Sequence, residues 1–423
     1  MFTPTPSLPQ RLDNDLVLKT VSSAADIERL AAFNGAMHDE GVAPLTRNLI
    51  LRHPYTRPEQ WPFIEDEATG VIVSTLCLIP GKWHYDEVEL LAGEMGIVGT
   101  LAEYRHRGLI RILDRYLKSL LAQGKYDLSQ IQGIPYFYRQ FGYEYAIPLE
   151  GGWRVELYAI PANPPGAETF TFRPAAVADI PALLQFYEAA AQDLRIGALR
   201  DAAIWRYLLG PSTQTGTAAE TWLVLDARQQ PVGYWRIGLY GFGEGLIVNE
   251  SSRLSHTATL AVLAYCKKLT LERGKPYIRL NLPAQHELVQ TARRLDAHDL
   301  STYAWQIHLP NIPQLLRKLA PVLERRLADS PFAGLTQTVV IDLYREAFEL
   351  GFVAGKLTGV KAVGFRDGGD IRLPPPLLAP LVLGYRSCAE LAQVYPDVRC
   401  WGQAQYLIDV LFPKVAAFIY PVY

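Results

Sequence analysis

The sequence predicts an α+β protein of three domains, in which the first two share one architecture. The chain has 423 residues, more than one hydrophobic core usually organises. Residues 95–123 read as an apolar strand, a basic turn and an amphipathic helix. A strand followed by a capped helix occurs near residue 16 and again near residue 171, which indicates a repeat of architecture. We therefore expect mixed sheets flanked by helices, in domains at 1–150, 151–309 and 310–423.

The composition is that of a globular protein without a global charge bias. Hydrophobic residues make up 49%, charged residues 20%, and the net charge is −2, so nothing general favours nucleic acid or an anionic membrane. The proline-rich start lacks the apolar stretch of a signal peptide, and the apolar runs are shorter than the roughly 20 residues that span a bilayer. The four cysteines form no C-x-x-C pair. We expect a soluble cytoplasmic protein with no metal, nucleic-acid or membrane partner.

The first domain is expected to open with a strand at 16–21 and a helix at 25–37 that Ser22 or Ser23 caps. Strands follow at 61–66, 71–79, 83–91 and 95–101, with turns at 67–70, 80–81 and 92–94. A helix at 109–121 repeats apolar residues at the spacing of one buried face. A strand at 126–133, a short helix at 134–142 and a strand at 143–149 complete the domain. The polar end of the first helix, Asn34 with 38–40, fits a solvated helix end better than a substrate contact.

The second domain follows a linker composition at 151–169, which contains Pro161, Pro164, Pro165 and Gly166. Its expected elements are a strand at 171–174 with a helix after it, strands at 221–225, 232–239, 245–250 and 277–282, and a helix at 255–272. The third domain is expected to hold one amphipathic helix at 312–327, strands at 336–344, 347–352, 359–365 and 415–420, and a helix from residue 388.

The turn at 103–108 is the first candidate for chemistry. Backbone N–H groups at a helix start converge and carry partial positive charge, so an anion can bind there. Gly108 lets the backbone approach a ligand closely because it has no Cβ. A solvated surface turn is the alternative for an isolated motif of this kind.

Arg105-x-x-Gly108 after a strand resembles the pyrophosphate-binding turn of the GNAT superfamily of acyl-CoA N-acetyltransferases. Residues 134–144, Ile-Pro-Tyr-Phe-Tyr-Arg-Gln-Phe-Gly-Tyr-Glu, resemble a second element of that superfamily. Together with these two elements, further segments extend the resemblance to nearly the full chain. It is to the Eis-like (enhanced intracellular survival) acetyltransferases, and the further segments are 232–236, 315–324, 384–387 and 411–413. This resemblance implies two GNAT-type domains followed by a sterol-carrier-protein-like domain. The second domain has no R-x-x-G at 250–256, so we expect it not to bind acyl-CoA.

The resemblance implies acetyl-CoA as cosubstrate and assigns residues to it. The strand edge would meet the pantetheine and the acetyl carbonyl, the turn would hold the pyrophosphate, and the next loop would line the thioester. In that order the residues are Val98, Gly99, Thr100, His106, Arg107, Gly108, Leu109, Ile110, Arg111, Gly133 and Ile134. Family members acetylate amines of aminoglycosides, lysine side chains or polyamines, and commonly assemble as hexamers.

The resemblance also assigns the proton transfers. Tyr138 matches the family's general acid, and the C-terminal carboxylate, here on Tyr423, matches its general base. A substrate ammonium with a pKa of about 10 must lose a proton before it attacks, and the departing thiolate must gain one. Residue chemistry alone favours an interior aromatic for Tyr138, because five other aromatic residues crowd 136–145. For Tyr423 both readings stay open, because chain ends are often frayed.

A different class of function also fits these features. A non-enzymatic protein could bind an acyl or lipid ligand in the third domain, with the GNAT pair as a degenerate scaffold. The intact turn and Tyr138 argue against this alternative. Which amine is acetylated is not encoded in any motif, because acceptor specificity depends on loops whose arrangement the sequence does not give.

Overall fold

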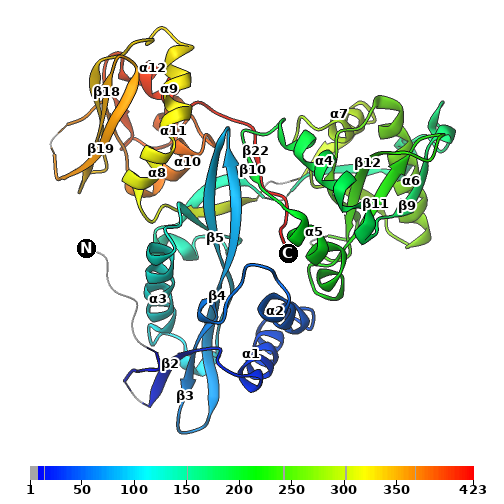
Figure 1. Ribbon diagram of the computed structural model, residues 1–423, viewed down its shortest axis with the longest axis horizontal. Helices are drawn as coiled ribbons and strands as arrows, with labels where there is room; N and C mark the ends of the chain where they lie inside the picture. Colours follow the sequence, from blue (N-terminus) through cyan, green and yellow to red (C-terminus); the bar gives the residue numbers. More distant parts are fainter. Residues whose placement is uncertain (1–7, 14, 150, 242, 301–302, 367) are drawn as a thin grey trace.

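The computed structural model describes residues 8–13, 15–149, 151–241, 243–300, 303–366 and 368–423, so the predicted boundary at 150 falls outside the described residues. Three sheets organise the chain into three lobes (Figure 1). Sheets and helices alternate along the chain, which confirms the α+β class.

The first sheet has the strand order β1-β2-β3-β4-β5-β6-β16-β7, with β10 beside β4 and β22 beside β10. Its strands are β1 (Gln10–Arg11), β2 (Leu16–Thr20), β3 (Pro62–Asp66), β4 (Val71–Tyr85), β5 (Val88–Thr100), β6 (Leu128–Ile131), β7 (Glu144–Pro148), β10 (Ile196–Ala198), β16 (Ala304–His308) and β22 (Ala417–Phe418). Its helices are α1 (Ala24–Met37), α2 (Val42–Leu51) and α3 (Leu109–Gln123). The helix α3 covers one face, and α1 and α2 lie on the other (Figure 1).

The helices α1 and α3 confirm two predictions. The Ser23 hydroxyl accepts a hydrogen bond from the Asp26 N–H at 3.1 Å and caps α1. The apolar stripe of α3 is buried at Leu109, Leu113 and Leu117, as the periodicity predicted. The helix α2 was not predicted, because it has no side-chain cap and a proline in its first turn.

The predicted turns at 80–81 and 92–94 are wrong. The strands β4 and β5 form one long hairpin, in which Pro80 pairs with Gly93. Pro80 is tolerated because it lies between the part of β4 that pairs with β3 and the part that pairs with β10, where no third strand needs its missing N–H.

The second sheet has the order β15-β8-β14-β13-β12-β11-β9. Its strands are β8 (Trp153–Glu156), β9 (Thr171–Pro174), β11 (Ala219–Leu225), β12 (Pro231–Gly238), β13 (Leu246–Ser251), β14 (Tyr277–Leu280) and β15 (His298–Asp299), and its helices are α4 (Ile180–Ala191), α5 (Ala202–Leu209), α6 (His256–Glu272) and α7 (Glu287–Arg294). The strand β8 pairs with β14, so the predicted linker at 151–169 begins with a strand of this sheet.

The third sheet has the order β19-β18-β17-β20-β21. Its strands are β17 (Gln337–Asp342), β18 (Ala347–Val353), β19 (Lys356–Gly364), β20 (Ile371–Arg372) and β21 (Arg399–Cys400), and its helices are α8 (Ile312–Lys318), α9 (Ala320–Ala328), α10 (Leu378–Val382), α11 (Cys388–Val394) and α12 (Ala404–Leu411). The single helix predicted at 312–327 is wrong. It divides at Leu319 because Pro321 starts a new helix.

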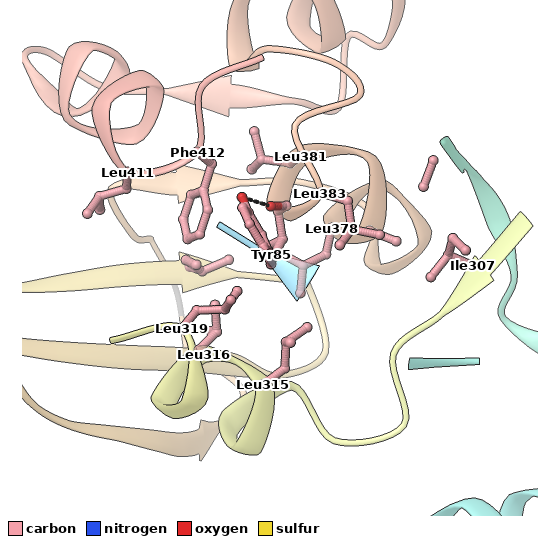
Figure 2. Packing of buried hydrophobic residues seen from close by; sticks show 14 of the residues in the cluster. Tyr85, Ile307, Leu315, Leu316, Leu319, Leu378, Leu381, Leu383, Leu411 and Phe412 are labelled. Atoms are coloured by element: carbon pink, nitrogen blue, oxygen red, sulfur yellow. Dashed lines mark hydrogen bonds between the residues drawn. The ribbon is translucent and has the colours of Figure 1, made fainter. Parts of the chain in front are cut away.

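Three strands from later parts of the chain, β10, β16 and β22, belong to the first sheet. The strand β16 lies between β6 and β7 of the first sheet, so the predicted boundary at 309 does not coincide with the edge of a sheet. The strand β10 joins β4, and β22 from the chain end joins β10. Figure 2 shows Tyr85 of β4 among leucines of the third lobe, with its hydroxyl donating to the Val382 carbonyl at 2.8 Å. The first and third lobes therefore share a core, whereas the second lobe has a core of its own.

Candidate functional site

The carboxyl-terminal half of β5 offers an uncovered strand edge. β5 pairs with β4 as far as Thr100, but with β6 only over 92–94. Ile97 has a φ of 48°, and the β4–β5 register shifts beside it, which marks a bulge. The predicted residues Val98, Gly99 and Thr100 lie on the part of β5 that β6 leaves uncovered.

The basic turn continues directly from this edge. Gly108 has a φ of 73° in the left-handed region, which a residue with a Cβ adopts only at a cost. It precedes α3 and provides no side-chain cap, so the first N–H groups of α3 receive no hydrogen bond from a capping side chain. This arrangement leaves the helix start open to an anion.

Positive charge surrounds the helix start. Arg105, His106, Arg107 and Arg111 are exposed. Arg107 lies over the Tyr104 ring at 4.6 Å, and Arg111 donates to Gln140 Oε1 at 2.9 Å. Across the described ranges no carboxylate forms a salt bridge with any of these arginines. Their charge is therefore available to a phosphate. Leu109 is buried in the core beneath α3 and Ile110 is half-buried, so these two contribute backbone groups.

The predicted thioester-end residues lie beside the β5 edge. Gly133 and Ile134 line a pocket of about 830 Å³ together with Ile97 and Asp39. The Gly133 carbonyl accepts hydrogen bonds from the Tyr303 hydroxyl and from Gln306 Nε2, so the segment leading into β16 holds this loop. This pocket brings the strand edge and the loop together.

Tyr138 lies behind that loop. It is in a short 3-10 helix, Phe137–Phe141, and only 6% of its surface is exposed. A Cβ on Gly133 would overlap its ring, so the glycine makes room for Tyr138. Burial raises the pKa of its hydroxyl, which keeps it protonated. Tyr138 is not among the residues that line the pocket beside Gly133.

Glu94 and Tyr423 meet in a second pocket of about 540 Å³. The Tyr423 hydroxyl donates to Glu94 Oε1 at 2.5 Å, and Gln130 Nε2 donates to Oε2 at 3.2 Å. Burial raises the pKa of Glu94 to about 7, against the opposing effect of these two hydrogen bonds. The two pockets share Gln132 in their walls. The structure thus places a titratable carboxylate next to the strand edge.

Sequence reasoning missed Glu94. The prediction put it in a turn at 92–94, where an acidic residue is ordinary. In the structure it lies inside a strand, 5% exposed, opposite Gln130 of β6. The available signal was a carboxylate with apolar residues and glycines on both sides, and the wrongly predicted turn at 92–94 made it look ordinary.

The second lobe holds the chain end. Arg200 Nη2 donates to the Pro421 carbonyl at 2.5 Å. The same guanidinium forms two hydrogen bonds of 2.6 Å to the buried Glu250 carboxylate, and the Tyr234 hydroxyl adds a third at 2.7 Å. This fixed anchor places Tyr423 in the pocket, so the chain end is not frayed there.

The corresponding helix start in the second lobe differs from that of α3. The Ser255 hydroxyl caps α6 by accepting a hydrogen bond from the Ala258 N–H at 3.2 Å. Its own side chain therefore occupies the place that an anion would take. This contrast supports the expectation that the second lobe binds no acyl-CoA.

None of the helices described is long and apolar enough to cross a membrane. Within the same part of the chain, no group of three or more His, Cys, Asp or Glu side chains could hold a metal ion.

The first lobe matches a known domain family. Residues 28–146 match the acetyltransferase (GNAT) domain, and this segment contains the β5 edge, the basic turn and Tyr138. The match supports an acyltransferase enzyme over the non-enzymatic alternative. No curated protein sequence matches the chain.

Solved structures share the fold along nearly the whole chain. A GCN5-related N-acetyltransferase from Anabaena variabilis has 17% identity and a TM-score of 0.70, over 95% of this chain and 99% of that one. Eis1 from Mycobacterium abscessus has 16% identity and a TM-score of 0.62, over 96% and 99%. A GCN5-related N-acetyltransferase from Kribbella flavida has 14% identity and a TM-score of 0.67, over 97% and 99%. At these identities the likeness concerns the fold.

Proposed function

We propose that this acyltransferase moves the acetyl group of acetyl-CoA to a primary amine. The observation that carries the proposal is the continuous path from the uncovered β5 edge through Gly108 to the uncapped start of α3. A long ligand that ends in phosphates can follow this path with its extended part along the strand and its phosphates at the helix.

The residues along the path fit acetyl-CoA. Residues 106–111 present backbone N–H groups and exposed positive charge where the pyrophosphate would lie. Residues 98–100 would pair with the pantetheine as an added strand does, and Gly133 with Ile134 would line the thioester end. The GNAT domain itself implies acetyl-CoA as the cosubstrate.

The reaction needs two proton transfers and one stabilised oxyanion. The thioester supplies an activated acetyl carbon. The amine loses a proton to a base and forms a bond to this carbon while the carbon–sulfur bond breaks, and the released thiolate takes a proton. Backbone N–H groups of the β5 edge stabilise the negative charge that develops on the carbonyl oxygen. The family resemblance assigns the proton donor to Tyr138, which lies behind the loop at Gly133; burial keeps its hydroxyl protonated, and the ring must reach the sulfur once acetyl-CoA is bound.

Two groups are candidates for the base, and they lie together. The carboxylate at the chain end, on Tyr423, is the one that the family resemblance implies. Glu94 is the second candidate, because it lines the pocket beside Tyr423 and its pKa of about 7 suits proton transfer near neutral pH. The Tyr423 phenol, which contacts Glu94 directly, then tunes the carboxylate. Replacement of each group separates the two roles.

Further parts of the proposal rest on the resemblance to Eis-like enzymes. The second lobe is a degenerate GNAT domain, the third lobe is sterol-carrier-protein-like, and the enzyme assembles as a homo-oligomer of hexamer type in the cytoplasm. The acceptor is an aminoglycoside, a lysine side chain or a polyamine. The pocket carboxylates Asp39 and Glu94 support a cationic acceptor.

The test measures acetyl-CoA binding first and turnover second. Isothermal titration of the full chain should show binding that falls at least about tenfold in the double variant Arg107→Ala, Arg111→Ala, because a charge-assisted contact contributes about 1.5–3 kcal/mol. The control variant Arg228→Ala removes an exposed arginine from a turn of the second lobe and should bind normally. Equal binding by all three proteins would reject the turn as the phosphate site.

Turnover identifies the acceptor class. Release of free CoA is measured with kanamycin, spermidine and a lysine peptide at a fixed acetyl-CoA concentration. A strong preference for one of these amines assigns the class. An enzyme that binds acetyl-CoA and releases no CoA with any primary amine would contradict N-acetyl transfer.

A further inference from the structure

Two of the four cysteines lie side by side in the third lobe. Cys388 is the first residue of α11, and Cys400 is the last residue of β21. Their Sγ atoms are 2.6 Å apart, nearer than unbonded sulfur atoms normally approach and close to the roughly 2.05 Å of a disulfide bond. A small shift of the two sulfur atoms would therefore bring them to bonding distance.

The surrounding structure holds both residues in place. Cys388 donates its N–H to Asp409 Oδ1 at 3.2 Å, and the Ser387 hydroxyl caps α11 by accepting a hydrogen bond from the Glu390 N–H at 3.1 Å. Cys400 pairs with Ile371 of β20. Because both backbones are fixed by contacts of their own, the sulfur–sulfur approach is a property of the fold rather than of a loose loop.

Access to the pair is one-sided. Cys388 is 1% exposed, whereas Cys400 is partly exposed. A small reagent can reach Cys400 and not Cys388. The other two cysteines, Cys77 and Cys266, are buried in the cores of the first and second lobes. Metal binding does not explain the pair, because the described residues supply no third ligand beside it.

We propose that Cys388 and Cys400 form an intramolecular disulfide by exchange with a low-molecular-weight disulfide of the glutathione type. Cys400, the sulfur that solvent reaches, loses its proton, attacks one sulfur of the reagent, forms a mixed disulfide and releases one thiol. Because the neighbouring Cys388 raises the pKa of the Cys400 thiol, this first step should become faster as the pH rises. The Cys388 thiol then loses its proton, attacks the Cys400 sulfur and releases the second thiol. The two cysteines together lose two electrons and two protons, and the reagent is reduced to two thiols.

The bond would join α11 to the edge of the third sheet. It closes a loop between residues 388 and 400, and a cross-link of this kind stabilises a domain mainly by restricting its unfolded state. The site is separate from the acetyl-transfer pocket, so the proposal does not depend on the proposed function.

The experiment treats the full chain with oxidised glutathione, quenches with acid, alkylates free thiols under denaturing conditions and measures intact mass. The expected product has lost about 2 Da, the mass of two hydrogen atoms, and carries two alkyl groups fewer than the reduced protein. Peptide mapping should place the link between Cys388 and Cys400. Reduction with dithiothreitol should restore all four alkylation sites.

Two variants complete the test. Cys388→Ser should stop at a stable glutathione adduct on Cys400, because the second attacking sulfur is missing. The matched control Cys266→Ser removes a cysteine of the second lobe and should still form the link. The proposal is overturned if the folded wild-type chain keeps all four thiols, if its adduct on Cys400 persists unresolved, or if the link maps elsewhere. The mapping on the wild-type chain decides the question even if a variant fails to fold.

Discussion

Replacement of Glu94 by glutamine should stabilise the protein, and the gain should grow with pH. Burial raises the pKa of Glu94 from its ordinary 4.5 to about 7 in the folded state. Below about pH 4.5 the carboxyl is protonated in both states and costs nothing. Between pH 4.5 and 7 the unfolded chain releases its proton while the folded chain keeps it, so stability falls as pH rises.

The size of this effect follows from the difference in pKa. Each tenfold change in proton affinity corresponds to about 1.4 kcal/mol. The buried charge therefore costs about 1 kcal/mol near pH 5 and about 3 kcal/mol near pH 8. Glutamine has no charge to bury, so the free energy of unfolding of Glu94→Gln, minus that of wild type, should rise by roughly 2 kcal/mol over this range.

The assay is urea denaturation of both proteins at four pH values from about 5 to 8. The difference between the two curves cancels the titration of every other group. The control Glu89→Gln changes the same functional group on the same strand at an exposed site, where Glu89 pairs with Lys82, and it should not reproduce the rise of roughly 2 kcal/mol because it removes no buried charge. If the difference in unfolding free energy between Glu94→Gln and wild type does not change with pH, burial does not raise the pKa of Glu94.

Three further predictions concern turnover, measured as CoA release at saturating acetyl-CoA. Tyr423→Phe removes the hydroxyl whose hydrogen bond lowers the pKa of Glu94, so the rising limb of the pH profile of kcat/KM should move to higher pH. An unchanged profile would show that the ionisation of Glu94 does not control the rate. Tyr138→Phe should lower kcat by about 100-fold or more, the usual contribution of a general acid, with acetyl-CoA affinity retained; unchanged kcat would leave Tyr138 as a core residue. A short extension after Tyr423 should reduce kcat because the chain end is packed beside Glu94, and a fully active extended enzyme would exclude the terminal carboxylate as base.

Local patterns predicted the parts of the site that are local in the chain. The strand, the turn with Gly108 and the helix α3 follow one another in sequence, and each has its own signal in periodicity or turn chemistry. The position of Glu94 was missed because proline and glycine usually indicate turns. Pro80 and Gly93 instead pair with each other inside the β4–β5 hairpin. A proline fits there only because no other described strand pairs with β4 at that point, and the sequence does not show this.

Pairings between distant segments left no signal of this kind. The strand β16 enters the first sheet more than 150 residues after the strand β7 beside it, and β22 is only two residues long. In neither strand does the hydrophobic pattern indicate which strand it pairs with. The salt bridge between Arg200 and Glu250 is equally invisible in the sequence, because each residue alone reads as an exposed charge, and only the fold makes both fully buried.

These distant pairings explain why the site needs all three lobes. The first lobe supplies the β5 edge, the turn and Glu94, but Tyr423 reaches Glu94 only at the end of the third lobe's chain. That chain end is positioned by the second lobe, through β10 beside β22 and through Arg200 at the Pro421 carbonyl. Arg200 is itself held by the buried Glu250. A change in the second lobe's core would therefore alter the position of Tyr423 and its hydrogen bond to Glu94 in the first lobe. In the proposed function the second lobe therefore acts on the chemistry by positioning the chain end, and we expect it not to bind acyl-CoA.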